Sequence, residues 1–208
     1  VSSADLYSSM ISGDVNISNG ATFQIDNQSG KDFILSNKLI GDTGSNFVID
    51  GEDDSLVILN GDNAGFGGVT TISRGDLSFT KNDNNSFVGG SVNIDNTNST
   101  LIYSTDTDGE VIKSLSGIGT IEKQGTGELT VNMDDFSGLA NVNAGTLTVN
   151  ADEQNEDSDG KFGFNANVAA NSTLNYNAGV NDTYNINSDS TFIFNSVDSG
   201  ATINFSNG

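Results

Sequence analysis

The feature of this sequence that most restricts its fold is a short alternating pattern that recurs along the whole chain. Apolar residues occupy every second position of short runs, and Gly, Asn, Asp and Ser separate these runs. Examples are Val92-Asn93-Ile94, Leu174-Asn175-Tyr176 and Tyr184-Asn185-Ile186. This period predicts strands with one face in a core, so we expect an all-β protein. Helical periodicity is almost absent, and residues 1–12 are the one candidate for an end cap.

The alternating runs occur in pairs, and the same kind of pair recurs along the chain. Residues 92–103, 166–176 and 184–194 each contain an apolar-Asn-apolar run, a polar corner, a Ser-Thr step and a second alternating run. Ile or Val recurs in the first run at roughly 18 to 32 residues, which is the range of solenoid repeats. The irregular interval predicts loops of variable length between strands.

Two architectures fit these pairs. They are antiparallel hairpins in a sandwich, or the two sides of one coil in a parallel β-helix. Asn recurs in equivalent runs at positions 16, 93, 141, 167 and 185. This recurrence favours stacked coils, because hairpins need no register from copy to copy. We therefore expect one solenoid over residues 1–208, with about nine or ten coils of roughly 20 to 23 residues, and an acidic loop projecting at residues 151–161.

The charge balance restricts the partners. The chain carries 28 Asp and Glu against 7 Lys and Arg, for a formal net charge of −21. Such a surface repels nucleic acid and anionic lipid headgroups, so no nucleic acid partner is expected. Cationic surfaces, divalent cations and neutral glycans stay open as partners. Solubility of an exposed, extended protein explains the charge equally well.

The residue types also restrict the chemistry. The chain has no His and no Cys, so it holds no Ser-His-Asp triad, Cys nucleophile or His-ligated metal. A glycosidase-type carboxylate pair is left open, because acids are plentiful. We expect no enzymatic activity, and we assign no catalytic or cofactor-binding residue. No apolar run approaches the ~18 residues that span a membrane.

Three short motifs are candidates for binding. Arg74-Gly75-Asp76 matches an integrin-type recognition tripeptide, although it also suits a turn between two strands. Asp106 and Asp108 in one loop, and Asn155, Asp157 and Asp159 in another, offer oxygen ligands at alternate positions beside Gly, which is what Ca²⁺ needs. Both loops lack the bidentate Glu at the twelfth position, where the sequence has Gly117 and Ala166. Solvated acidic loops are the alternative interpretation.

The stretch 116–150 resembles a known repeat. The segment Gly117-Ile118-Gly119-Thr120-Ile121-Glu122-Lys123-Gln124-Gly125-Thr126-Gly127-Glu128-Leu129 is followed by Val142-Asn143-Ala144-Gly145-Thr146-Leu147. This order is similar to the passenger-associated repeat of bacterial autotransporters. The match is residue by residue over this stretch, and the flanking chain shares only the general pattern of the repeat.

The resemblance implies a right-handed parallel β-helix exported through the outer membrane to the bacterial cell surface by a C-terminal translocation barrel. That barrel and a signal peptide are absent from the sequence, so we expect an excised passenger segment. Passengers of this family include self-associating adhesins, proteases and toxins, so the fold does not fix the function.

Three functions follow as expectations. The first is an adhesin segment that mediates cell–cell self-association and biofilm, or attachment to a host surface protein or glycan, through the side of the rod. The second is a glycan-binding or glycan-cleaving β-helix. The third is an inert spacer for a functional domain outside this segment.

Overall fold

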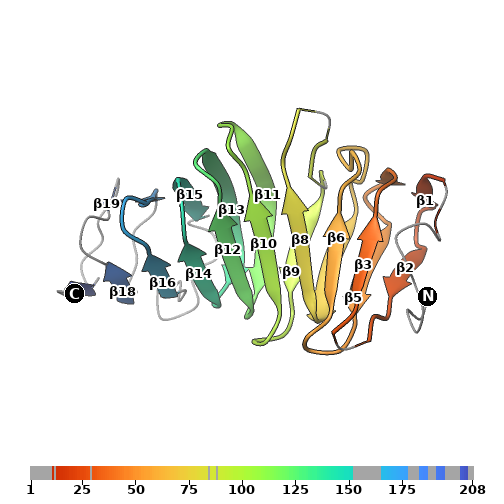
Figure 1. The fold of residues 1–208 in the computed structure, drawn as a ribbon, viewed down its shortest axis with the longest axis horizontal. Coiled ribbons are helices and arrows are strands. Elements are labelled where there is room, and N and C mark those ends of the chain that lie inside the picture. Colours follow the sequence, from red (N-terminus) through yellow and green to blue (C-terminus); the bar gives the residue numbers. More distant parts are fainter. Residues whose placement is uncertain are drawn as a thin grey trace.

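The computed structural model describes residues 11, 13–28, 30–83, 85–87, 89–151, 165–177, 183–186, 191–194 and 202–205. These residues form an all-β solenoid in which every paired strand runs parallel to its neighbour. Figure 1 shows the strands side by side along the long axis, with β2 near one end and β19 near the other. The expected parallel β-helix is confirmed, and the antiparallel sandwich is wrong.

Twenty strands are described along the chain. They are β1 (Val15–Ile17), β2 (Thr22–Ile25), β3 (Asp32–Leu35), β4 (Leu39–Gly41), β5 (Asn46–Asp50), β6 (Leu56–Leu59), β7 (Val69–Arg74), β8 (Asp76–Thr80), β9 (Ser91–Ile94), β10 (Thr100–Ser104), β11 (Glu110–Gly117), β12 (Thr120–Gln124), β13 (Glu128–Phe136), β14 (Leu139–Val142), β15 (Thr146–Ala151), β16 (Asn165–Val168), β17 (Thr173–Tyr176), β18 (Thr183–Ile186), β19 (Thr191–Phe194) and β20 (Thr202–Phe205).

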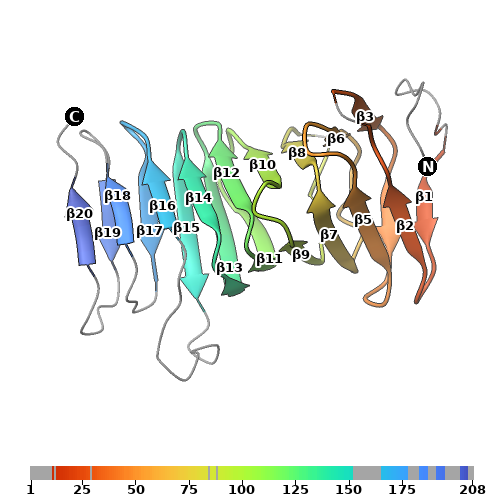
Figure 2. The same cartoon turned by 90° about the horizontal axis from the view of Figure 1, so that it is seen from below.

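Two long sheets form the sides of the solenoid, as Figure 2 shows from below. Sheet 1 has the order β2-β5-β7-β9-β11-β13-β15-β17-β19, and sheet 2 has the order β3-β6-β8-β10-β12-β14-β16-β18-β20. Successive strands in sequence therefore alternate between the sheets, and each turn adds one strand to each. A small third sheet pairs β1 with β4.

The number of coils needs a correction. The chain completes about six turns, which it does within residues 13–151, the part described without a long gap. This count differs from the nine or ten coils that were predicted for residues 1–208. The predicted period was too short for the first coils, where Thr22 pairs with Asn46, 24 residues later. Strands described beyond Ala151 extend each long sheet to nine strands.

The coils differ in length along the chain. Glu128 pairs with Thr146 only 18 residues later, whereas Thr146 pairs with Thr173 27 residues later. The first coils have a third side, made by β1, β4 and the bridge between Gly41 and Phe66. Beyond Phe66 no further strand joins this third sheet among the described residues, so the later coils have two paired sides.

The core consists of columns of inward-facing residues. In sheet 2, Leu59, Phe79 and Tyr103 occupy successive layers of one column and are buried. Because strand side chains alternate between faces, every second residue of a run enters the core, as the alternation predicted. Burying each large apolar side chain contributes about 1.5–3 kcal/mol, and neighbouring coils supply the cover.

The three sequence repeats do not begin on the same side of the coil. The first run of repeat 92–103 is β9 in sheet 1, whereas the first runs of 166–176 and 184–194 are β16 and β18 in sheet 2. The repeat is therefore a half-turn, one strand plus one corner. Both sheets need the same inward-outward alternation, so their sequences look alike.

Tight turns make many of the corners. Hydrogen bonds join residues three apart, from Ala21 N to Ser18 O and from Ser172 N to Ala169 O. The third residue of these turns has a positive φ, +77° at Gly20 and +62° at Asn171. Gly and Asn tolerate this conformation, so the Gly and Asn between the runs set the corners.

The expected cap at residues 1–12 and the projecting acidic loop at 151–161 lie outside the described residues, apart from Ile11 and the backbone of Ala151.

Close stacking of corners predicts a large effect of Gly90→Ala. A Cβ atom there would lie 1.8 Å from the carbonyl oxygen of Gly68, in the coil below, so the coils must separate. We expect the substitution to destabilise the protein by about 1–3 kcal/mol, measured by thermal and denaturant unfolding.

Gly65→Ala is the matched control, because its nearest neighbour would be Ile40 Cγ1 at 3.7 Å, an ordinary contact. Equal unfolding midpoints for the two variants would show that the corner at Gly90 accommodates a Cβ atom.

Candidate functional site

The tripeptide Arg74-Gly75-Asp76 forms the corner between β7 and β8. Arg74 Nε donates to Asp50 Oδ1 at 3.0 Å, and the backbone N–H of Thr100 donates to Asp76 Oδ1 at 2.8 Å. Gly75 has a φ of +79°, which favours glycine. Burial raises the pKa of the Asp76 carboxyl, and the hydrogen bonds from Thr100 oppose this shift. Each charged side chain is thus bound to a neighbouring coil, and receptor recognition by this motif stays a prediction.

An open hollow lies beside this corner and is lined by Glu52, Asp53, Asp54 and Arg74. The hydrogen bond and charge of Asp50 raise the pKa of the Arg74 guanidinium. The three lining acids are exposed. This arrangement suits a polar or cationic ligand, and the lining contains no aromatic side chain for stacking on a sugar.

The first predicted Ca²⁺ loop, with Asp106 and Asp108, accepts hydrogen bonds from the backbone of the next coil. Asp106 Oδ1 accepts the backbone N–H of Thr126 at 2.9 Å, and Asp108 Oδ1 accepts that of Glu128 at 2.8 Å. The N–H of Thr126 is the main reason that the pKa of Asp106 lies below its usual value. The structure therefore gives these two carboxylates a structural role.

The second predicted Ca²⁺ loop, with Asn155, Asp157 and Asp159, lies outside the described residues. Within the described ranges, no group of three or more Asp or Glu is placed to hold a metal ion. Calcium binding therefore stays a prediction for both loops.

A row of asparagines occupies one register position of sheet 2, and its described side chains, those of Asn141 and Asn167, lie on the outer face. Asn141 pairs with Asn167, Asn167 with Asn185, and Asn185 with Asn204 in the register of four successive strands. Asn167 Nδ2 donates to Asn141 Oδ1 at 2.9 Å. Of the five asparagines that the sequence aligned, 141, 167 and 185 thus stack. Asn93 lies in sheet 1, half a turn away, and Asn16 lies on β1 in the small third sheet.

A second ladder lies on sheet 1 and its adjoining corner. Asn150 Nδ2 donates to Asn132 Oδ1 at 3.0 Å, and Asn177 Nδ2 donates to Asn150 Oδ1 at 2.6 Å. Beside it, Asn175 Nδ2 donates to Thr148 Oγ1 at 3.2 Å. Both long sheets therefore present stacked, uncharged amides and hydroxyls to solvent toward the C-terminal end.

The charge on the strands, unlike that of the chain as a whole, is distributed unevenly. Residues 13–136 contain 19 acidic and six basic residues, and residues 137–208 contain eight acidic residues and one basic residue. The strands β14 to β20, by contrast, contain no charged residue. The remaining acids of the C-terminal part belong to segments between these strands, which lie outside the described residues. The C-terminal strand faces are thus neutral in a strongly acidic chain.

Lys123 is a buried cation to which the sequence analysis assigned no role of its own. Its Nζ donates to the carbonyl oxygens of Gln124, Gly125 and Ala144 at 2.7, 2.8 and 3.3 Å. Its side chain is 0% exposed. A signal was available, because Lys123 shares the inward phase of Ile121 in an alternating run. The ammonium group ties two successive corners together.

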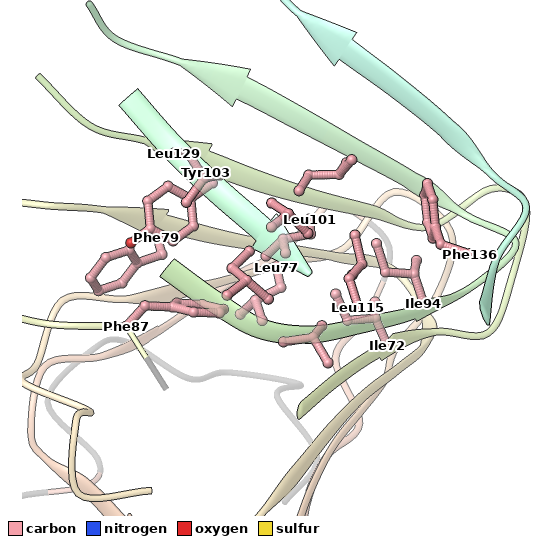
Figure 3. Close-up of a cluster of buried hydrophobic side chains, with 14 of the residues drawn as sticks. Ile72, Leu77, Phe79, Phe87, Ile94, Leu101, Tyr103, Leu115, Leu129 and Phe136 are labelled. Carbon is pink, nitrogen blue, oxygen red and sulfur yellow. The ribbon is translucent and has the colours of Figure 1, made fainter. Parts of the chain in front are cut away.

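Aromatic residues at or beyond the strand ends complete the core. Phe66 and Phe87, which lie between strands, and Phe136, the last residue of β13, are buried. Figure 3 shows Phe87 beside Phe79 and Tyr103, with ring centroids 5.1 and 5.2 Å away. Tyr103 Oη donates to Glu110 Oε2 at 2.8 Å, and burial raises the Tyr103 pKa. This cluster is part of the packed interior.

Comparisons with known proteins give no relative: no family model, no curated protein and no solved structure matches the chain. In the described part of the chain, no helix is long and apolar enough to cross a membrane.

The contacts of Lys123 predict that Lys123→Met destabilises the fold. Methionine has a similar length but donates no hydrogen bond, so three carbonyl oxygens lose a partner. We expect a loss of about 1–3 kcal/mol in the free energy of unfolding, measured by denaturant titration. Unchanged stability would mean that water replaces the ammonium group.

The same lysine predicts a pH dependence. Burial lowers the pKa of Lys123 from 10.5 to about 8 in the folded protein. Between these values the unfolded chain binds more protons, so stability should rise with pH from about 8 toward 10.5, at up to about 1.4 kcal/mol per pH unit. Unfolding measured across this range should show the rise in the parent protein and not in Lys123→Met. Parallel pH profiles would contradict the expected shift.

Proposed function

We propose that this chain is a segment of a bacterial surface adhesin of the autotransporter passenger type, and that its rod mediates cell–cell self-association through its side. The observation that carries the proposal is the pair of amide ladders on the outer faces of the two sheets. In sheet 2 the ladder includes the hydrogen bond between Asn167 and Asn141.

The ladders suit side-on contact because each amide keeps bonding capacity. An Asn side chain has two N–H donors and an acceptor oxygen, and stacking along the ladder uses one donor and one lone pair. The remaining groups face solvent and match the same groups on a second ladder. Each new hydrogen bond contributes about 0.5–1.5 kcal/mol net, so affinity would come from summing many of them along the rod.

The hand of the coils and the route to the cell surface are part of the same proposal. We infer right-handed coils, because nearly all parallel strand–crossover–strand connections have that hand. Export to the cell surface and a translocation barrel elsewhere in the full-length protein rest on the resemblance of the stretch 116–150. A host surface protein or glycan is the alternative partner for the same faces, and no catalytic role is proposed.

The hollow at Glu52, Asp53, Asp54 and Arg74 supports a second candidate function, glycan binding or cleavage. Its acids and guanidinium offer hydrogen bonds to sugar hydroxyls. Incubation with a polysaccharide panel tests it, and release of shortened products would place this function first.

Self-association predicts a size that grows with concentration. We expect sedimentation velocity to show a monomer at low micromolar concentration and a dimer at higher concentration, and cells that display the segment to clump. The control is a display of the same segment with its outer ladder residues replaced by Lys. Strictly monomeric protein together with dispersed cells would overturn the proposal and favour the spacer function.

A further inference from the structure

Apolar side chains form a row on the outer face of sheet 2 in its N-terminal part. Ile34 on β3 pairs in register with Ile58 on β6, and Ile102 on β10 holds the same position two strands further on, beyond Ser78. Each isoleucine alternates with buried residues of its strand, so its side chain points away from the core. All three are half-buried. We call these residues, together with Leu56 on the same face of β6, the isoleucine row.

The surroundings show that this grouping is local. The same register position is occupied further along sheet 2 by Glu122 and then Asn141. On the outer face of sheet 1, Val48 has Gln24 and Thr71 as its neighbours in register. A single apolar residue of this kind is ordinary on a protein surface, whereas adjoining apolar residues with a polar rim are typical of an interaction site.

Carboxylates border the isoleucine row where the strands of sheet 2 begin. Asp32 is exposed at the start of β3, and Asp76 is half-buried at the start of β8. Leu56 lies between them in register, and the exposed Asp54 precedes it by two residues, in the corner that leads to β6. Glu122 follows the last isoleucine in register. We call these four carboxylates the acidic margin.

The carboxylates of the margin lie close enough to influence one another. Burial raises the pKa of the Asp76 carboxyl, and the hydrogen bonds from Thr100 lower it. The negative charges of Glu122 and Asp54 then raise this pKa further. The margin is therefore one continuous region of negative potential beside the isoleucine row.

The cations near the margin do not neutralise it. Arg74 forms an ion pair with Asp50 at 3.0 Å, so its charge is already matched by a carboxylate outside the margin. Lys31 is exposed beside Asp32. One lysine against four carboxylates leaves an excess of negative charge, which attracts cationic groups from solution.

An apolar row with a negative margin along one side matches one class of partner. We propose that the isoleucine row and its acidic margin bind a basic amphipathic polypeptide, whose apolar side chains cover the isoleucines while its Lys or Arg side chains pair with the carboxylates. Charge complementarity selects this occupant. A second copy of the chain carries the same carboxylates and a net charge of −21, and nucleic acid and anionic lipid are repelled in the same way.

This inference does not rest on the proposed self-association, because its partner and its part of the sheet are different. The row from Ile34 to Ile102 spans three strand spacings, about 14 Å, and the margin extends it to Glu122, about 19 Å. A peptide of about 12 residues covers this length as a helix, and about six residues cover it when extended.

A labelled model peptide tests the chemistry. The probe is a peptide of about 12 residues with alternating Leu and Lys, and fluorescence anisotropy measures its Kd for the protein. We expect the Kd to rise at least about tenfold between about 50 mM and about 500 mM NaCl, because salt screens the charge pairs.

Two control peptides separate charge from apolar contact. One replaces every Leu by Ser, and the other replaces every Lys by Glu. We expect each to bind at least about tenfold more weakly than the probe, because both contributions are needed. Equal affinity of the Ser-Lys peptide would overturn the role of the isoleucine row, and a probe that does not bind at all would overturn the proposal.

Matched variants test the location of the apolar contact. Ile58→Thr keeps a β-branched side chain on the strand but removes apolar surface, and Val48→Thr makes the corresponding change on the outer face of sheet 1. We expect Ile58→Thr to raise the Kd of the probe about fivefold and Val48→Thr to leave it unchanged. Equal effects of the two variants would show that the row is not the binding surface.

A second pair of variants tests the margin at constant net charge. Asp32→Asn removes a carboxylate of the margin, and Asp83→Asn removes an exposed one in the corner between β8 and β9, at the opposite end of the sheet 2 strands. We expect Asp32→Asn to raise the Kd about threefold and to reduce its salt dependence, while Asp83→Asn changes neither. If both variants have the same effect, binding follows the net charge of the protein and the margin is not the site.

Thermal unfolding confirms that all four variants are folded. Sedimentation velocity of the protein without peptide measures self-association, so the two proposals fail separately. If Ile58→Thr abolishes self-association and the probe does not bind, the occupant of the isoleucine row is a second copy and not a basic peptide.

Discussion

The parallel hydrogen-bond ladder between successive coils is the constraint on which the rest of this structure depends. Each strand pairs with the strand one turn before and one turn after it, so no coil is complete alone. The ladder fixes the register, and the register places like residues over like. The buried column Leu59, Phe79 and Tyr103 and the solvent-facing Asn141 and Asn167 both result from this single repeat, one on each face of the same sheet.

Stacking at the strand spacing also dictates the corners. Coils this close leave no space for a side chain where backbone passes over backbone, so Gly90 lies over Gly68 and Gly138 over Gly119. Polar side chains complete the corners where glycine does not. Asp106 and Asp108 accept backbone N–H groups of the next coil, and Lys123 donates to carbonyl oxygens of two corners. Much of the charge that suggested ligand binding in the sequence is thus used to join one turn to the next.

The uneven distribution of charge among the strands connects the architecture with the proposed function. A solenoid can vary its outer residues freely, because only the inward phase must stay apolar. In this chain the N-terminal strands carry acidic residues, and the sequences of β14 to β20 contain no charged residue. Under the proposed self-association, the outer amides of Asn141 and Asn167 offer uncharged hydrogen-bonding groups to a second copy. The hydrogen bond between Asn167 and Asn141 shows that the amides are already ordered in a single copy, which lowers the entropy lost on pairing.

The sequence by itself determined the all-β class, the solenoid repeat and the inward residues, because alternation and turn residues are local signals that each strand carries in full. It also indicated that Asn141, Asn167 and Asn185 would stack. Only the tertiary structure decided which sheet each strand joins, since the two sides of a coil have the same pattern and the repeats 92–103 and 166–176 differ by half a turn. The structure likewise decided the roles of Arg74, Asp76 and Asp106, because their hydrogen-bond partners lie on neighbouring coils about 20 or more residues away, a distance that no local pattern encodes.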